Sequence, residues 1–275
     1  MKFNLNVKTI QFTAAVFIIS SVFSCNRVTD AMRPFLLSDD QEIQLGRNLN
    51  NQILSDTKNY PRYNGSTSVK NFVDSLGQRI ASVQKDWNYS SLKFTFTIIN
   101  DTTQINAFSI PGGYVYVYTG LLKAASNSSE LAGVLAHEIG HITKHHGADK
   151  LIQGQAVGYV NTILFGNDSS SIASAVASLA ENLVFLGFSK GDEYQADSCA
   201  VAYTVKADIN PVGMEHFLGY LQKKYGDTPK IFEPLSDHPP LSDRMKKVRE
   251  IIGKIGADTT KSPDAEQYLK IRGSI

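Results

Sequence analysis

Cysteine and tryptophan are scarce in this chain of 275 residues, which contains two cysteines and one tryptophan. Cys25 lies at the end of an export signal described below, and its lipidation would leave Cys199 as the only thiol. An intrachain disulfide is then excluded, so the fold must rest on its hydrophobic core. The chain that remains after the signal, about 250 residues, is long enough for one domain with a sizeable core.

An excess of positive charge is also missing. The chain has 27 basic and 26 acidic side chains, and removal of residues 1–24 takes away two lysines, which leaves 25 basic and 26 acidic side chains. Nucleic acid is therefore not an implied partner, because binding to phosphates would need a basic surface. No repeat of roughly 20–50 residues is visible, so the sequence predicts no helical-repeat extension.

Long apolar runs are missing after residue 23. The run near the start, residues 10–23, carries no charge and follows Lys2 and Lys8. It is shorter than the roughly 20 apolar residues of a membrane span, so it predicts a signal peptide. The signal ends at Ser24 and is followed by Cys25, which resembles a bacterial lipoprotein cleavage site in which Cys25 becomes the lipidated first residue. The alternative is an ordinary signal peptide with an incidental cysteine.

We therefore divide the chain into a signal peptide (1–24), a lipidated tether (25–35) and one folded domain (36–275). A lipid anchor holds a domain on a membrane face without a spanning helix. This division predicts a periplasm-facing lipoprotein of the bacterial cell envelope, on the outer membrane, whose contact with the membrane is the lipid on Cys25.

The most informative stretch is His137-Glu138-Ile139-Gly140-His141. Asn127 and Glu130 resemble a capping box, and the apolar residues after them predict a helix over residues 129–150. Residues four apart share a helix face, so His137 and His141 can hold one Zn²⁺ at about 2.0–2.1 Å each. Glu138 is placed to take a proton from the attacking water, an arrangement typical of metalloproteases. The alternative is a polar helix face with solvated histidines.

A catalytic zinc with two histidine ligands needs a third protein ligand and an open position. Glu193 is the best candidate in the sequence, and Asp197 lies one helical turn further on, on the same face. Asp197 is suited to accept a hydrogen bond from the far nitrogen of a ligand histidine. The alternative for this stretch is an exposed acidic start of a helix.

A nearer third ligand is not available. The metzincin pattern needs Gly and His where this chain has Lys144 and Gly147, so that pattern fails. His145 lies about two helical turns from His137, too far along the axis to share its metal. His145 and His146 are expected to support a ligand from behind or to lie on the surface.

The run Tyr114–Tyr118 alternates strictly between tyrosine and valine, which predicts a strand with the tyrosines on one face. Pro111 and the two glycines after it suggest that this strand begins at a bend or an edge. An edge strand just before the zinc helix could bind an extended peptide by backbone pairing, through Gly113, Tyr114, Val115 and Tyr116. The alternative is an amphipathic strand whose tyrosines face solvent.

The fold class that follows is α+β and mostly helical, with a small antiparallel sheet and an active-site helix. Residues 151–187 predict two helices that form a hairpin. Its apolar side chains are expected to belong to the hydrophobic core, and the alternative is a lid packed over the cleft or against a membrane. The tail after residue 256 is expected to be loosely held, apart from Tyr268 and Leu269. The other predicted elements are helices at 36–54, 69–83, 210–225 and 242–255 and a strand at 92–99.

Several separated motifs agree with one family. They are Asn106-Ala107-Phe108 with Pro111-Gly112-Gly113, the histidine–glutamate motif at 137–141, Glu193 with Ala196-Asp197, and His238-Pro239 with Arg244. Together they resemble the gluzincin metallopeptidases that include HtpX, the CAAX prenyl proteases and the BepA-like periplasmic peptidases. The likeness spans residues 36–252. Because no membrane span is predicted after the signal, the chain resembles the soluble or lipoprotein branch of this family.

The resemblance implies a zinc metallopeptidase domain with one Zn²⁺ per chain, held by His137, His141 and Glu193. It implies that Glu138 is the general base and that Asp197 orients a ligand histidine.

The same resemblance implies that the late His238 and Arg244 face the cleft. His238 could stabilise the oxyanion, or its loop could move so that His238 fills the open zinc position and silences the enzyme.

The expected activity is zinc-dependent endopeptidase cleavage of unfolded or misassembled envelope polypeptides, in protein quality control. Two alternatives stay open. One is a chaperone-like lipoprotein that keeps zinc structurally, and the other is a peptidase held latent by His238.

Overall fold

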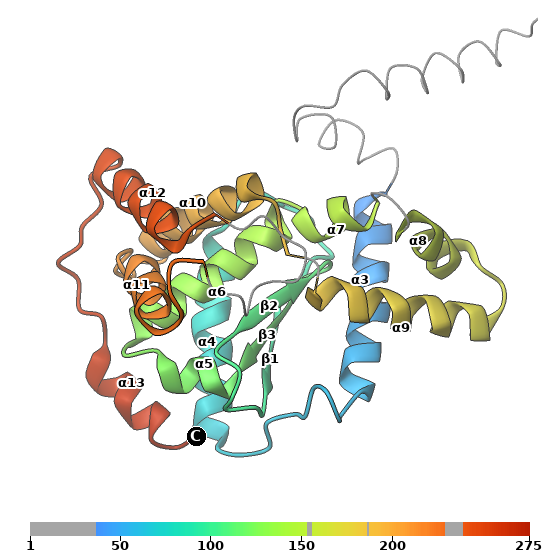
Figure 1. Cartoon of the computed structure of the whole chain (residues 1–275), viewed down its shortest axis with the longest axis horizontal. Helices are drawn as coiled ribbons and strands as arrows, with labels where there is room; N and C mark the ends of the chain where they lie inside the picture. The colour runs from blue at the N-terminus through green and yellow to red at the C-terminus, as the bar shows by residue number, and fades with distance from the viewer. Residues whose placement is uncertain (1–36, 153–155, 186, 229–238) are drawn as a thin grey trace, which may run out of the picture.

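The computed structural model describes residues 37–152, 156–185, 187–228 and 239–275. A small sheet lies in the middle of this part, and helices cover both of its faces (Figure 1). In chain order the described elements are α3 (Asp39–Ser55), α4 (Thr67–Val83), β1 (Thr95–Ile99), β2 (Ala107–Ile110), β3 (Tyr114–Tyr118), α5 (Thr119–Ala124), α6 (Ser128–Thr143), α7 (His146–Leu151), α8 (Ala156–Phe165), α9 (Ser169–Phe185), α10 (Lys190–Lys206), α11 (Gly213–Tyr225), α12 (Leu241–Lys254) and α13 (Ala265–Arg272).

The mostly helical α+β class is confirmed, but the sheet is mixed rather than antiparallel. Its strand order is β1-β3-β2, with β1 parallel and β2 antiparallel to β3. Gly112 and Gly113, with φ of 81° and 98°, turn the chain from β2 into β3. The prediction that Tyr114–Tyr118 is an edge strand is therefore wrong, because neighbours on both sides use its backbone groups.

Both faces of β3 are buried. Val115 and Val117 belong to the apolar cluster that contains α4 and α6, whereas Tyr116 and Tyr118 belong to a second cluster with α3 and the α8–α9 hairpin. The Tyr116 hydroxyl donates a hydrogen bond to Asn50 of α3 at 2.7 Å. The alternative of solvent-facing tyrosines is thus wrong for Tyr116 and Tyr118, because a helical layer covers their side of the sheet.

The predicted helical hairpin is present as α8 and α9. The core interpretation holds for its inner face, where Val160, Ile163 and Leu179 pack into the second cluster. Phe165 at the end of α8 is 65% exposed. Among the described residues, none of the helices combines the length and the apolar character that a membrane span requires.

One local prediction is wrong. The helix expected over residues 129–150 is interrupted, because α6 ends at Thr143 and His145 adopts a left-handed conformation with φ of 60° before α7 begins. In the tail, Tyr268 of α13 is fully buried, as expected, and its hydroxyl donates to the Leu122 carbonyl at 2.7 Å, whereas Leu269 is 47% exposed.

The packing of α6 against α10 positions the site, and it is the most extensive helix pairing in the described part of the chain. Gly140 lies at the crossing, where a Cβ atom would stand 2.7 Å from the Cβ of Cys199 and 3.3 Å from the backbone of Ala196. Real Cβ atoms do not approach so closely. Small residues at this crossing therefore let α10 reach the face of α6 that carries the two histidines.

We expect Gly140→Ala to lower the free energy of unfolding by about 1–3 kcal/mol, because the added methyl group overpacks the crossing. Gly253→Ala in α12 is the matched control, since a Cβ there meets nothing within 4 Å. That change should stabilise the protein by up to ~1 kcal/mol through helix propensity. Urea unfolding measures the stability of both variants. Stabilisation of Gly140→Ala equal to that of Gly253→Ala would contradict the close packing of α6 against α10.

Candidate metal centre

The helix that carries the predicted ligands is buried along its whole length. It begins as expected at Asn127, whose side-chain oxygen accepts the backbone N–H of Glu130 at 3.0 Å. The Glu130 carboxylate accepts the backbone N–H of Ser126 at 2.8 Å. In Figure 1 α6 runs between the sheet and the C-terminal helices α10 and α11, which accounts for the burial of its residues.

The structure brings His137, His141 and Glu193 around one point. The two Nε2 atoms are 3.0 Å apart, and the Glu193 oxygens lie 3.6 Å from Nε2 of His137 and 3.8 Å from Nε2 of His141. Ligands bound tetrahedrally to one zinc at about 2.1 Å are about 3.4 Å from each other. The three side chains therefore fit a zinc ion, and all three are buried.

Asp197 contacts one of these histidines. Its Oδ1 lies 3.0 Å from Nδ1 of His137, so the imidazole donates Nδ1–H to the carboxylate and leaves the Nε2 lone pair for a metal. Burial disfavours the charged carboxylate, but Arg244 and His137 outweigh that effect and hold the pKa of Asp197 below its usual range. The predicted orienting contact is thus present in the structure.

Arg244 binds two carboxylates of α10, Asp197 and Glu193, at once. Its Nε and Nη2 donate to the two oxygens of Asp197 at 2.9 and 2.7 Å, and its Nη1 lies 2.8 Å from Oε2 of Glu193. Arg244 is expected from the sequence to face the cleft, and in the structure it lies against Glu193 and Asp197 beside the metal position. Its contacts are those of a residue that positions the ligands.

Glu138 points toward β2. The Ser109 hydroxyl donates a hydrogen bond to its Oε2 at 2.8 Å, and both residues are buried. Burial raises the pKa of Glu138, an effect that the charge of His137 and the Ser109 hydrogen bond partly offset. A carboxylate with a raised pKa is suited to accept and return a proton near neutral pH. Ser109 was not predicted as a site residue, although it lies between the two parts of the motif formed by residues 106–108 and 111–113.

The two histidines differ in their proton affinity. Burial and the charge of His137 keep the pKa of His141 well below its usual range, so His141 is neutral. Burial opposes a charged His137, but the Asp197 hydrogen bond and the nearby carboxylates raise its pKa. Because a ligand histidine must give up that proton, metal affinity should fall as the pH drops through the raised pKa.

Two predicted site residues, Val115 and Tyr116, lie in the central strand β3 and not at this centre. His238 and Cys25 lie outside the described residues. The structure also brings together a second group that could hold a metal, namely Asp39, Glu42 and His145. In that group Nδ1 of His145 is 2.8 Å from Oε2 of Glu42, a hydrogen-bonding distance.

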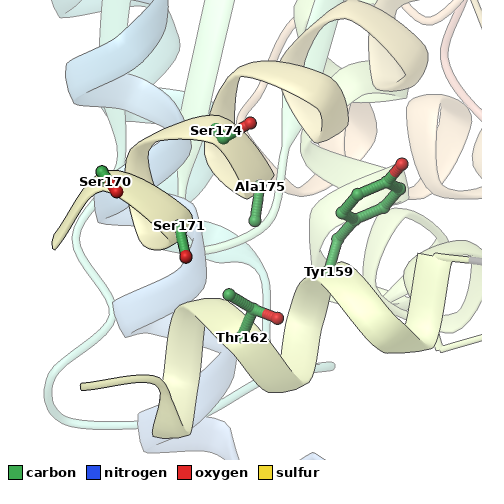
Figure 2. Close-up of a pocket in the computed structure, with 6 residues that line it drawn as sticks. All are labelled: Tyr159, Thr162, Ser170, Ser171, Ser174 and Ala175. Atoms are coloured by element: carbon green, nitrogen blue, oxygen red, sulfur yellow. The ribbon is translucent and has the colours of Figure 1, made fainter. Parts of the chain in front are cut away.

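A pocket of about 450 Å³ lies elsewhere, between α8 and α9. Figure 2 shows Tyr159 and Thr162 on α8, with Ser171 and Ala175 of α9 pointing toward that helix. The pocket lining shares no residue with the metal centre. The lining residues are Tyr159, Thr162, Ser170, Ser171, Ser174 and Ala175.

Two histidines one turn apart and a carboxylate that could share one metal ion, with a buried glutamate next to the first histidine, are the arrangement typical of metallopeptidases. The chain belongs to peptidase family M48, whose sequence profile matches residues 70–252. The resemblance to the gluzincin metallopeptidases is thereby confirmed.

Named relatives agree with this family. The chain is 30% identical over 216 residues to the beta-barrel assembly-enhancing protease of Yersinia pestis, covering 73% of this chain and 42% of that protein. It is 27% identical over 217 residues to the mitochondrial metalloendopeptidase OMA1 of Schizosaccharomyces pombe, covering 78% of this chain and 62% of that protein. It is 27% identical over 188 residues to the metalloprotease YcaL of Escherichia coli (strain K12), covering 64% of this chain and 70% of that protein. The chain thus spans less than half of the beta-barrel assembly-enhancing protease.

We expect Arg244→Met to destabilise the metal-free protein by about 3–5 kcal/mol, because it leaves two buried carboxylates without their cation. Arg249→Met is the matched control on the same helix, since Arg249 pairs with Glu215 at an exposed position. That variant should change stability little. Thermal and urea unfolding measure the stability of both variants. A small effect of Arg244→Met would mean that burial of Glu193 and Asp197 does not depend on the arginine.

Proposed function

We propose that this chain is a zinc-dependent endopeptidase of the histidine–glutamate motif type, acting on unfolded or misassembled polypeptides. The observation that carries the proposal is the spacing of three ligand atoms around one point, with the Glu138 carboxylate beside them. The zinc would be one ion per chain, held by His137, His141 and Glu193. The family and the named metallopeptidase relatives support the same reaction class.

Zinc at this position would supply Lewis-acid chemistry, which polarises the scissile carbonyl and acidifies water. The protein residues supply the rest. Glu138 accepts the proton of the attacking water and then passes it to the leaving amine, a role typically worth about 10²–10⁴ in rate. The Ser109 hydroxyl holds the Glu138 carboxylate in place, and Asp197 fixes the ring of His137.

The substrate strand proposed here is β2, because β3 is paired on both sides. The Asn106 carbonyl accepts the backbone N–H of Tyr118. Ladder hydrogen bonds alternate along an antiparallel pair, so the backbone groups of Ala107 and Ser109 point to the outer edge. No other described strand pairs with that edge. An extended peptide added there would lie beside Glu138, and folded proteins seldom offer such a segment.

His238 lies outside the described residues, so its two expected roles stay predictions. As an oxyanion donor it would be worth about 3–4 kcal/mol in the transition state. As a ligand that fills the open zinc position it would instead suppress activity.

We expect the purified mature protein with zinc to cleave an unfolded protein such as casein, and Glu138→Gln to lose at least about 100-fold of that activity at equal zinc content. Glu250→Gln is the control, since Glu250 is exposed on α12. Zinc binding without cleavage by the wild type would favour the chaperone-like or latent alternatives. His238→Ala then separates these two, because restored cleavage identifies a latch.

We further propose that the protein is a lipoprotein of the bacterial envelope, with quality control of envelope proteins as its task. Several relatives are named beta-barrel assembly-enhancing protease, which supports an envelope substrate. The expected outcome is fatty-acid labelling of the wild type at Cys25 and its recovery with outer membranes. Cys25→Ser should be unlabelled and released in soluble form, and labelling of that variant would contradict the assignment.

A further inference from the structure

The two ligand histidines are supported differently. His137 donates to a carboxylate, whereas Nδ1 of His141 lies 2.9 Å from Nδ1 of His146. The other nitrogen of His146, Nε2, lies 2.7 Å from Oε1 of Gln195 on α10. A chain of two imidazoles and one amide therefore runs from the metal position back to the helix that supplies Glu193.

The amide oxygen sets the direction of this chain. An amide oxygen only accepts, so Nε2 of His146 must carry a proton. Neutral His146 then offers Nδ1 as an acceptor, and Nδ1 of His141 must be the donor. That tautomer leaves Nε2 of His141 unprotonated, which is the nitrogen that faces His137 and Glu193.

The interruption of the helix between α6 and α7 makes the contact between His141 and His146 possible. His145 has a φ of 60°, which for a non-glycine residue costs of order 1–3 kcal/mol. Its ring is held by Glu42 of α3 at 2.8 Å and packs on Trp87 with ring centroids 4.3 Å apart. This turn brings the imidazole of His146 behind His141 in place of a continued helix.

Two further contacts restrict the rings. Phe188 stacks on His141 with centroids 3.9 Å apart and an angle of 18° between the planes. Asp192 lies 3.8 Å from Nε2 of His146, further than Gln195, and its carboxylate accepts the backbone N–H of Ser189. Gln195 is thus the nearer acceptor for Nε2 of His146. Because Gln195 lies on the exposed side of α10, another side chain can replace it without overpacking.

We propose that His146 and Gln195 are positioning residues for the metal ligand His141, and that they fix its tautomer and ring orientation for zinc. This inference rests on the proposed zinc site. Outer partners of this kind typically change metal affinity by about 10–100-fold when they are removed. Neither residue touches the metal position itself, so the expected effect is on zinc binding first.

The test compares Gln195→Leu, Gln195→Glu and the wild type, with Gln267→Leu on the exposed side of α13 as the control. Leucine removes the acceptor at similar size, whereas glutamate keeps one. We expect Gln195→Leu to weaken zinc binding about 10–100-fold in competition with a chromogenic chelator. Gln195→Glu and Gln267→Leu should bind zinc at least as tightly as the wild type.

Histidine side-chain ¹⁵N NMR of the zinc-loaded protein gives the second readout, because it reports whether His141 carries its proton on Nδ1. A zinc affinity of Gln195→Leu within twofold of the wild type would overturn the inference, as would weakening of both Gln195 variants alike. If the wild type binds no zinc, the proposed function itself fails. If the wild type binds zinc and cleaves while Gln195→Leu is unchanged, only this inference fails.

Discussion

Two carboxylates on one face of α10, Glu193 and Asp197, are buried beside the histidines of α6, and the site depends on how their charge is compensated. Buried charges are tolerated only with close, hydrogen-bonded partners of opposite sign. Arg244 of α12 supplies one partner through three contacts. A metal ion between Glu193 and the two histidines would supply the other. The same charges that prepare the metal position therefore also hold three helices together.

This electrostatic requirement can be met only because the helices approach closely. Gly140 between the two ligand histidines removes the side chain that would keep α10 away, and Ala196 and Cys199 face it. The sheet contributes from the opposite direction, since Ser109 of β2 holds the carboxylate of Glu138. Each reacting group is thus held by a rigid element and by a second group behind it, which is the requirement for a preorganised site.

The sequence could place His137, Glu138 and His141 because their relation is local, set by the helical period. Glu193 could be found from the number of ligands that zinc needs, although it lies far away in the chain. The central position of β3 could not be predicted, because strand pairing depends on tertiary neighbours that periodicity does not reveal. The break at His145 was missed for the same reason, since its left-handed turn is held by Glu42 and Trp87 from other segments.

The most direct measurement is a crystal structure of the zinc-loaded protein with anomalous diffraction collected at the zinc edge. The account predicts one zinc peak per chain, at about 2.0–2.1 Å from Nε2 of both His137 and His141 and bound by the Glu193 carboxylate. A peak at the group formed by Asp39, Glu42 and His145, or the absence of zinc between α6 and α10, would contradict it.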